Sequence, residues 1–181
     1  VRATDGLLIG CEALIRWRDP ELGDVPPTEF IPVAERSGFI VSIGAWVLRQ
    51  AVQQAALWHG RGHRLLMSIN VSALQFQQPD FVDSVMRAVQ VYSLDGHLME
   101  LEITESLLMR DFEANAIKLG RLSAAGIRIA IDDFGTGYSS FKYLSRFPIH
   151  TLKIDQSFVQ DLDREENMSI VNAMIAMGRG M

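Results

Sequence analysis

The feature that most constrains the fold of this chain is a regular alternation between two hydrophobic patterns. Short apolar runs predict strands, and between them lie longer stretches with apolar residues at helical spacing. The expected strands are Leu7–Ile15, Arg64–Val71, Leu98–Thr104, Ile127–Asp132 and Thr151–Ile154. The expected helices are Ser42–Trp58, Asp80–Gln90, Asp111–Ala125 and Glu165–Met177. Strands separated by helices favour an α/β fold with a parallel sheet.

The number of these repeats favours a (β/α) barrel, although an open parallel sheet fits the same periodicity. A complete eight-stranded barrel takes about 250 residues, and this chain has 181. We therefore expect residues 1–181 to form one partial domain, a (β/α)8 barrel that is incomplete in this chain and lacks its first strand and its C-terminal strands. Such a barrel exposes strand edges, so a swapped dimer and a fragment that does not fold as a compact monomer remain open.

Composition narrows the class of protein. The chain is 48% hydrophobic and 22% charged, which suits a globular domain with a sizeable core. Its net charge of -5 argues against a surface for DNA or RNA polymers, because such surfaces are usually basic. The single cysteine, Cys11, excludes an intrachain disulfide and favours a reducing, cytoplasmic setting. No apolar run approaches the roughly 20 residues of a membrane span, although an anchor outside this chain is compatible with the sequence.

Acidic, amide and cationic side chains follow the predicted strands. In barrel enzymes the reactive groups come from the C-terminal ends of the strands. The groups at those ends here are Glu12, Arg16, Asn70, Glu102, Glu105, Asp132, Asp133, Lys153 and Asp155. Mg²⁺ and Mn²⁺ prefer carboxylate and amide oxygens, so part of this set predicts an oxygen cage for a divalent cation. The predicted cage consists of Glu12, Asn70, Glu102 and Asp132.

The predicted cage suits chemistry on a phosphodiester. Two divalent ions about 4 Å apart polarise a phosphate ester and lower the pKa of a bridging water. Asp133 is adjacent to Asp132 and is placed to reach the second ion. Lys153 is a candidate to orient the water or to offset negative charge on the phosphate, and the planar guanidinium of Arg16 suits phosphate oxygens.

Each of these residues also has an ordinary structural interpretation. A single acidic residue at a strand end is usually a helix cap or a solvated loop residue. Asp132 and Asp133 precede Gly135, where a tight turn is the simplest explanation. Glu105 is equally well placed to cap the helix that follows it. The joint pattern favours the metal site, because several carboxylates at one barrel mouth repel one another unless cations lie between them.

Short motifs along the whole chain resemble those of a known family. They are Glu12–Trp17, Pro27–Gly38, Ile69–Ser72, Glu100–Ser106, Asp132–Ser140 and Leu152–Asp155. In combination they resemble the EAL domain, a family of bacterial phosphodiesterases specific for cyclic di-GMP. The resemblance implies a modified TIM-type (β/α)8 barrel that hydrolyses cyclic di-GMP to linear pGpG.

The resemblance also implies roles for individual residues and the ions they hold. The ions would be Mg²⁺ or Mn²⁺, two in the complete site, with Ca²⁺ inhibitory. The metal ligands would be Glu12, Asn70, Glu102, Asp132 and Asp133. The catalytic residues would be Lys153, which positions the water, Asp133, which serves the second metal and the attacking water, and Glu105, which holds the loop after Asp133. The substrate contacts would be Arg16, Leu14 and Asp155.

Partners and an alternative function follow from the same resemblance. It implies a homodimer coupled to metal binding through residues 133–140, and a sensory or GGDEF domain elsewhere in the protein. The sequence lacks the Gln-Pro pair that precedes Glu12-Ala13-Leu14 in the family, and it ends before a further catalytic glutamate. The alternative is therefore a non-catalytic, cyclic di-GMP-binding regulatory module, above all in the truncated form.

Overall fold

A computed structural model of the protein describes residues 1–136, 144, 146–160, 162 and 164–180. The chain divides into two compact units, Val1–Leu101 and Glu102–Met181. Strand β5 (Met99–Thr104) runs across the boundary between them. Among the described residues, no helix combines the length and the apolarity that crossing a bilayer requires.

The main sheet has five strands in the order β1-β4-β5-β6-β7. Strands β1 (Gly10–Ala13) and β4 (Leu66–Asn70) are parallel, with Glu12 opposite Ser68. Strands β6 (Arg128–Phe134) and β7 (Thr151–Ile154) are parallel as well. Neighbours in the sheet follow the order of the sequence, as in a barrel, whereas a doubly wound sheet reverses its order at one point. The predicted α/β class and the incomplete (β/α)8 barrel are confirmed.

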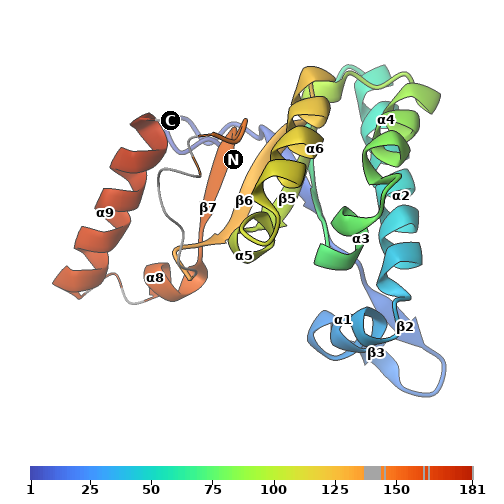
Figure 1. Ribbon diagram of the computed structural model, residues 1–181, viewed down its shortest axis with the longest axis horizontal. Coiled ribbons are helices and arrows are strands. Elements are labelled where there is room, and N and C mark those ends of the chain that lie inside the picture. The colour runs from blue at the N-terminus through green and yellow to red at the C-terminus, as the bar shows by residue number, and fades with distance from the viewer. Residues whose placement is uncertain (137–143, 145, 161, 163, 181) are drawn as a thin grey trace. The chain divides into compact units, whose positions relative to one another are not determined.

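The helices of the first unit are α1 (Pro27–Arg36), α2 (Ile40–Gly60), α3 (Ala73–Gln77) and α4 (Phe81–Val91). Helix α2 contacts β4 and α3, and it lies beside α4 (Figure 1). The buried face of α4 follows from its helical spacing of apolar residues, with Phe81, Val82, Val85 and Ala88 all buried. This face and α2 hold the core of the unit together.

A small antiparallel hairpin precedes α1 and was not predicted. It consists of β2 (Trp17–Asp19) and β3 (Gly23–Val25). Its turn is fixed by the carboxylate of Asp19, which accepts backbone N–H bonds from Glu21 at 2.9 Å and Leu22 at 3.1 Å. The Trp17 ring meets the Phe30 ring of α1 edge to face, with centroids 5.7 Å apart. The hairpin is thus attached to α1.

The second unit has helices α5 (Glu105–Leu108), α6 (Phe112–Ala124), α8 (Gln156–Gln160) and α9 (Glu165–Gly180) beside strands β6 and β7. Asp111 starts α6, because its carboxylate accepts the N–H of Ala114 at 3.4 Å. Helix α9 contacts both α8 and β7 (Figure 1). The middle of β6 is fully buried, as its unbroken run of apolar residues requires.

Most predicted elements are present with shifted ends. The predicted strand Leu7–Ile15 is reduced to β1, and Leu7 and Leu8 are more than half exposed. Leu98 belongs to the 3₁₀ helix η1 (Gly96–Leu98), which Asp95 caps by accepting the His97 N–H at 3.0 Å. The prediction for Thr151–Ile154 is confirmed without change. Helix α1, ten residues long, was not predicted. The other elements that the sequence did not predict have three to five residues, too few for a periodic pattern.

Candidate active site

Two of the predicted metal ligands meet in the first unit. Glu12 lies on β1 and Asn70 is the last residue of β4, and both side chains are exposed. The Asn70 amide nitrogen donates to Glu12 Oε1 at 2.6 Å. The nitrogen is thus engaged with the carboxylate, and the amide oxygen, the atom that binds hard cations, is the one left for a ligand. We call these two residues the Glu12–Asn70 pair.

The predicted substrate contacts Leu14 and Arg16 follow β1. Leu14 is 55% exposed, and Arg16 donates from Nη1 to the carbonyl of Ile15 at 2.8 Å. Both residues line a cavity of about 400 Å³ between β1 and α2, together with Glu12 and Trp46. Leu14 and Arg16 therefore share a wall with a predicted metal ligand, while their contact with substrate remains a prediction.

Three predicted residues meet in the second unit around one ammonium group. Lys153 Nζ lies 2.5 Å from Glu102 Oε2 and 3.5 Å from Asp132 Oδ1. Glu102 is 3% exposed, and Asp132 and Lys153 are partly buried. A carboxylate as buried as Glu102 requires a cation or several hydrogen bonds, and Lys153 supplies the cation. We call these three residues the Lys153 cluster.

Asp133 and Asp155 form a second acidic contact beside the Lys153 cluster. Burial, followed by the charges of Asp132 and Asp155, raises the pKa of Asp133. Asp155 has a lowered pKa, first because the Ser157 hydroxyl donates to it and then because the Ser157 N–H does, at 2.9 Å. Asp133 also has a φ of 53°, in the left-handed region that few residues other than glycine adopt. Strained residues of this kind often lie at functional sites.

Glu105 is buried at the start of α5 and holds the backbone after Asp133. Its Oε2 accepts the N–H of Gly135 at 3.1 Å. Gly135 has a φ of 100°, and a Cβ there would lie 2.9 Å from the Phe158 ring of α8 and closer still to Met174 of α9. Only glycine fits this position. The motif residues 137–140 lie outside the described part of the chain.

One polar pair in the sheet was missed by the sequence analysis. The Ser68 hydroxyl donates to Glu100 Oε1 at 3.0 Å, and both side chains are buried. Ser68 precedes Asn70 by two residues and Glu100 precedes Glu102 by two, so each lies on the same face of its strand as a predicted ligand. Polar residues alternate with apolar ones on these strands, and this alternation was the signal that Ser68 and Glu100 lie on the same face as Asn70 and Glu102.

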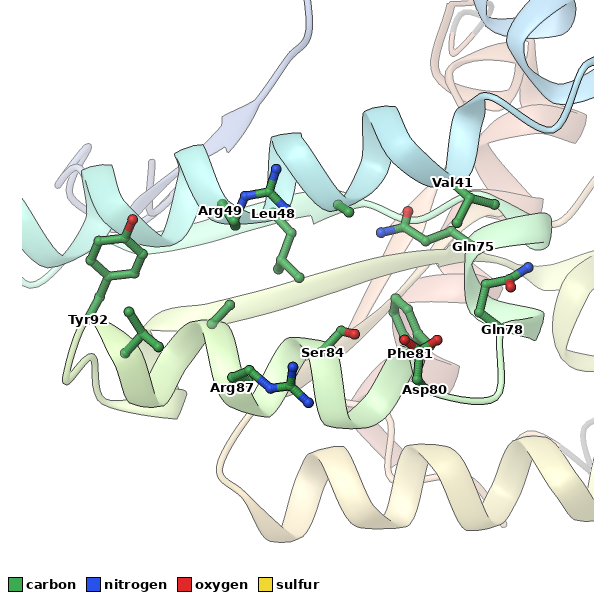
Figure 2. A pocket seen from close by; sticks show the side chains of 13 residues that line it. Val41, Leu48, Arg49, Gln75, Gln78, Asp80, Phe81, Ser84, Arg87 and Tyr92 are labelled. Atoms are coloured by element: carbon green, nitrogen blue, oxygen red, sulfur yellow. The ribbon is translucent and has the colours of Figure 1, made fainter.

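A further cavity, of about 390 Å³, lies between α2 and α4 (Figure 2). Its walls are mainly apolar and include none of the predicted site residues. Across the described residues, no three His, Cys, Asp or Glu side chains are grouped closely enough to hold a metal ion. The predicted cage mixes carboxylates with the Asn70 amide, and in each unit its members contact one another or Lys153.

The sequence of this chain is similar to those of known proteins. The family model of the EAL domain matches residues 1–181. The bifunctional diguanylate cyclase/cyclic di-GMP phosphodiesterase MucR of Pseudomonas aeruginosa is 47% identical over 181 residues, 99% of this chain and 26% of MucR. The cyclic di-GMP phosphodiesterase PdeR of Escherichia coli is 37% identical over 171 residues, 94% of this chain and 26% of PdeR. The chain thus spans 26% of the length of either relative.

A solved structure agrees in fold as well as in sequence. It is the PaMucR phosphodiesterase in complex with c-di-GMP, and it is 47% identical to this chain with a TM-score of 0.94. The superposition covers 98% of this chain and 73% of the solved one. The motif residues that carried the resemblance include the Glu12–Asn70 pair and the Lys153 cluster. Because the family model covers the whole sequence, the chain belongs to the EAL domain family.

Proposed function

We propose that this chain is the catalytic part of a phosphodiesterase that hydrolyses cyclic di-GMP to linear pGpG. The observation that carries the proposal is the 47% identity and TM-score of 0.94 to a phosphodiesterase solved with c-di-GMP. The chain also has acidic, amide and lysine residues at or near the ends of its strands.

Divalent cations fit the side chains that this chain offers. Glu12, Asn70, Glu102 and Asp132 supply oxygen donors only, which suits Mg²⁺ or Mn²⁺. In the Lys153 cluster an ammonium lies within 3.5 Å of two carboxylates, so positive charge is already stabilised there. Burial and then the charges of Asp132 and Asp155 raise the pKa of Asp133, and a second cation beside it would offset those charges. Bound cations would polarise the phosphodiester and lower the pKa of a water molecule.

The side chains of this chain would bind the substrate, orient the attacking water and position the backbone of the site. Arg16, Leu14 and Asp155 hold the substrate, with the Arg16 guanidinium on a phosphate oxygen. Lys153 and Asp133 orient one water molecule. As the oxygen of this water bonds to phosphorus, the water loses one proton. The bond from phosphorus to one ribose oxygen breaks, and that ribose oxygen takes up a proton, so that one water molecule is consumed. Glu105 acts through the backbone, since it fixes Gly135 and so the direction of the chain after Asp133.

Partners follow from the relatives. Because MucR bears the name of a bifunctional cyclase and phosphodiesterase and the chain spans 26% of it, we propose a GGDEF or sensory domain as a partner in the whole protein. A homodimer coupled to the loop after Asp133 belongs to the same proposal. The sedimentation velocity of the whole protein, with and without Mn²⁺, tests the dimer.

The proposed function is tested by incubating the protein with cyclic di-GMP in Mg²⁺ or Mn²⁺ and measuring the pGpG formed by chromatography. The assay is run on this chain and on the longest gene product that contains it. We expect turnover by the longer product, loss of turnover with Glu12→Ala, and no turnover in Ca²⁺. Binding of cyclic di-GMP without any product, in the longer protein, would replace the enzyme with the non-catalytic regulatory module.

A further inference from the structure

Helix α3 directly follows the predicted ligand Asn70, and it is too short to hold its own position. It spans Ala73–Gln77, five residues, whereas isolated helices shorter than about 12 residues are marginal in water. Its first turn is closed by Ser72, whose hydroxyl accepts the Gln75 N–H at 3.2 Å. Contacts with other elements must therefore fix the direction in which the chain leaves Asn70.

One of these contacts joins the side chain of Gln75, on α3, to helix α2. Gln75 is 7% exposed, and Figure 2 shows its amide directed from α3 toward α2. It packs against Gly44, at a point where α2 has no side chain. A Cβ at Gly44 would lie 2.8 Å from Gln75 Nε2, and closer still to its carbonyl end. The absence of a side chain at Gly44 is therefore what admits the amide of Gln75.

The packing of Gln75 has a consequence for the Glu12–Asn70 pair. The distance in sequence from Asn70 to Gln75 is short, and Ser72, half-buried between them, ties the turn to the Gln75 backbone. Phe76, fully buried next to Gln75, packs on Phe81 of α4 with ring centroids 5.4 Å apart. Helix α3 is thus held between α2 and α4, and the end of β4 is held with it.

We propose that Gln75 is a positioning residue for Asn70, and that it acts by fitting against Gly44 of α2. The proposal rests on the proposed function, because it assigns Asn70 to the metal site. The amide of Gln75 packs against Gly44, and we assign it no contact with substrate or metal. It sets the exit of β4, and through it the orientation in which Asn70 presents its amide oxygen while the amide nitrogen holds Glu12 at 2.6 Å.

The test is a double-mutant cycle read by Mn²⁺ affinity. The full-length protein is titrated with Mn²⁺ alone, and free Mn²⁺ is followed by electron paramagnetic resonance. Gln75→Ala removes the orienting group and should weaken Mn²⁺ binding about tenfold, as loss of a group that orients a ligand typically does. Gly44→Ala displaces the Gln75 amide and should weaken Mn²⁺ binding by a similar factor. The double variant should bind Mn²⁺ about as well as either single variant, because both changes remove the same contact.

Matched controls separate positioning from general damage. Gly60→Ala adds a methyl group to the same helix where nothing lies within 4 Å, and it should leave Mn²⁺ affinity unchanged. If Gln75→Ala lowers the Tm but binds Mn²⁺ as the unaltered protein does, or if the losses of the two single variants multiply in the double variant, the positioning role is wrong. If the unaltered protein binds no Mn²⁺, the metal site and the proposed function fail together with it.

Discussion

The Glu12–Asn70 pair and the Lys153 cluster balance negative charge in different ways. Glu12 is exposed and is held by a neutral amide, whereas Glu102 is 3% exposed and is held by an ammonium. An exposed carboxylate keeps water as a partner, and a buried one does not. The exposed pair is thus compatible with the absence of a cation, while the buried cluster contains a cation supplied by the protein itself.

The largest effect is expected from removing the cation that the protein itself supplies to Glu102. Lys153→Met leaves Glu102 buried without its ammonium and should lower the free energy of unfolding in EDTA by about 3 kcal/mol, as for a broken buried ion pair. Mn²⁺ should restore part of the loss, because it replaces the missing charge. Denaturant unfolding with EDTA and with Mn²⁺ measures both. Lys153→Arg is the control that keeps the charge. Equal stability of Lys153→Met and the unaltered protein would contradict the argument.

A second change tests Glu105, another buried carboxylate of the second unit. Glu105→Ala leaves the Gly135 N–H without its acceptor and should cost about 2 kcal/mol of unfolding free energy. Glu105→Gln keeps an acceptor oxygen, so it should cost about half as much. Glu113→Ala, at an exposed site on α6, serves as control. The role of Glu105 would be refuted if the alanine and glutamine variants unfolded at the same denaturant concentration.

In the exposed Glu12–Asn70 pair, a substitution should affect the response to Mn²⁺ and leave the stability in EDTA nearly unchanged. Glu12→Ala should change the unfolding free energy in EDTA by no more than about 0.5 kcal/mol, as is usual for surface sites. It should also abolish the rise in Tm that Mn²⁺ produces, because that rise depends on binding to the folded state. Thermal unfolding with and without Mn²⁺ checks both, with Glu21→Ala as an exposed control. A Glu12→Ala protein that Mn²⁺ still stabilises would remove Glu12 from the ligand set.

The smallest effect concerns a carboxylate outside both clusters. Backbone N–H bonds from Glu21 and then Leu22 lower the pKa of Asp19 below its ordinary value of 3.8. The folded state therefore favours the carboxylate, and its contribution is present above pH 3.8 and is lost as the pH falls through the lowered pKa. Asp19→Asn should reduce stability slightly at neutral pH, and the difference should vanish in that acidic range. A difference that persists at lower pH would show that the charge is not involved.

The sequence predicted most of the long elements, because their periodicity is a local pattern, but it missed the ten-residue helix α1. The assignment of metal ligands stays a prediction. Strand β7 and the end of β4 at Asn70 are signalled by apolar runs that stop at polar residues, whereas Glu102 and Asp132 lie before the ends of β5 and β6. The hairpin β2–β3 was missed, since three-residue strands show no alternation. The contact of Gln75 with Gly44 and the bond from Gly135 to Glu105 join residues about 30 positions apart, and no local pattern reveals such pairs.

The amide proton of Gly135 offers a way to measure the opening of the backbone near Asp133 by hydrogen exchange. This proton is bonded to a carboxylate that is 3% exposed, and the side chains of Phe158 and Met174 leave no room for a Cβ beside it. Exchange of this proton with solvent deuterium requires the Glu105 contact to open, so its protection factor reports how often the backbone after Asp133 is released. A single glycine resonance, followed during a titration with Mn²⁺ or cyclic di-GMP, would register that opening without any label placed in the site.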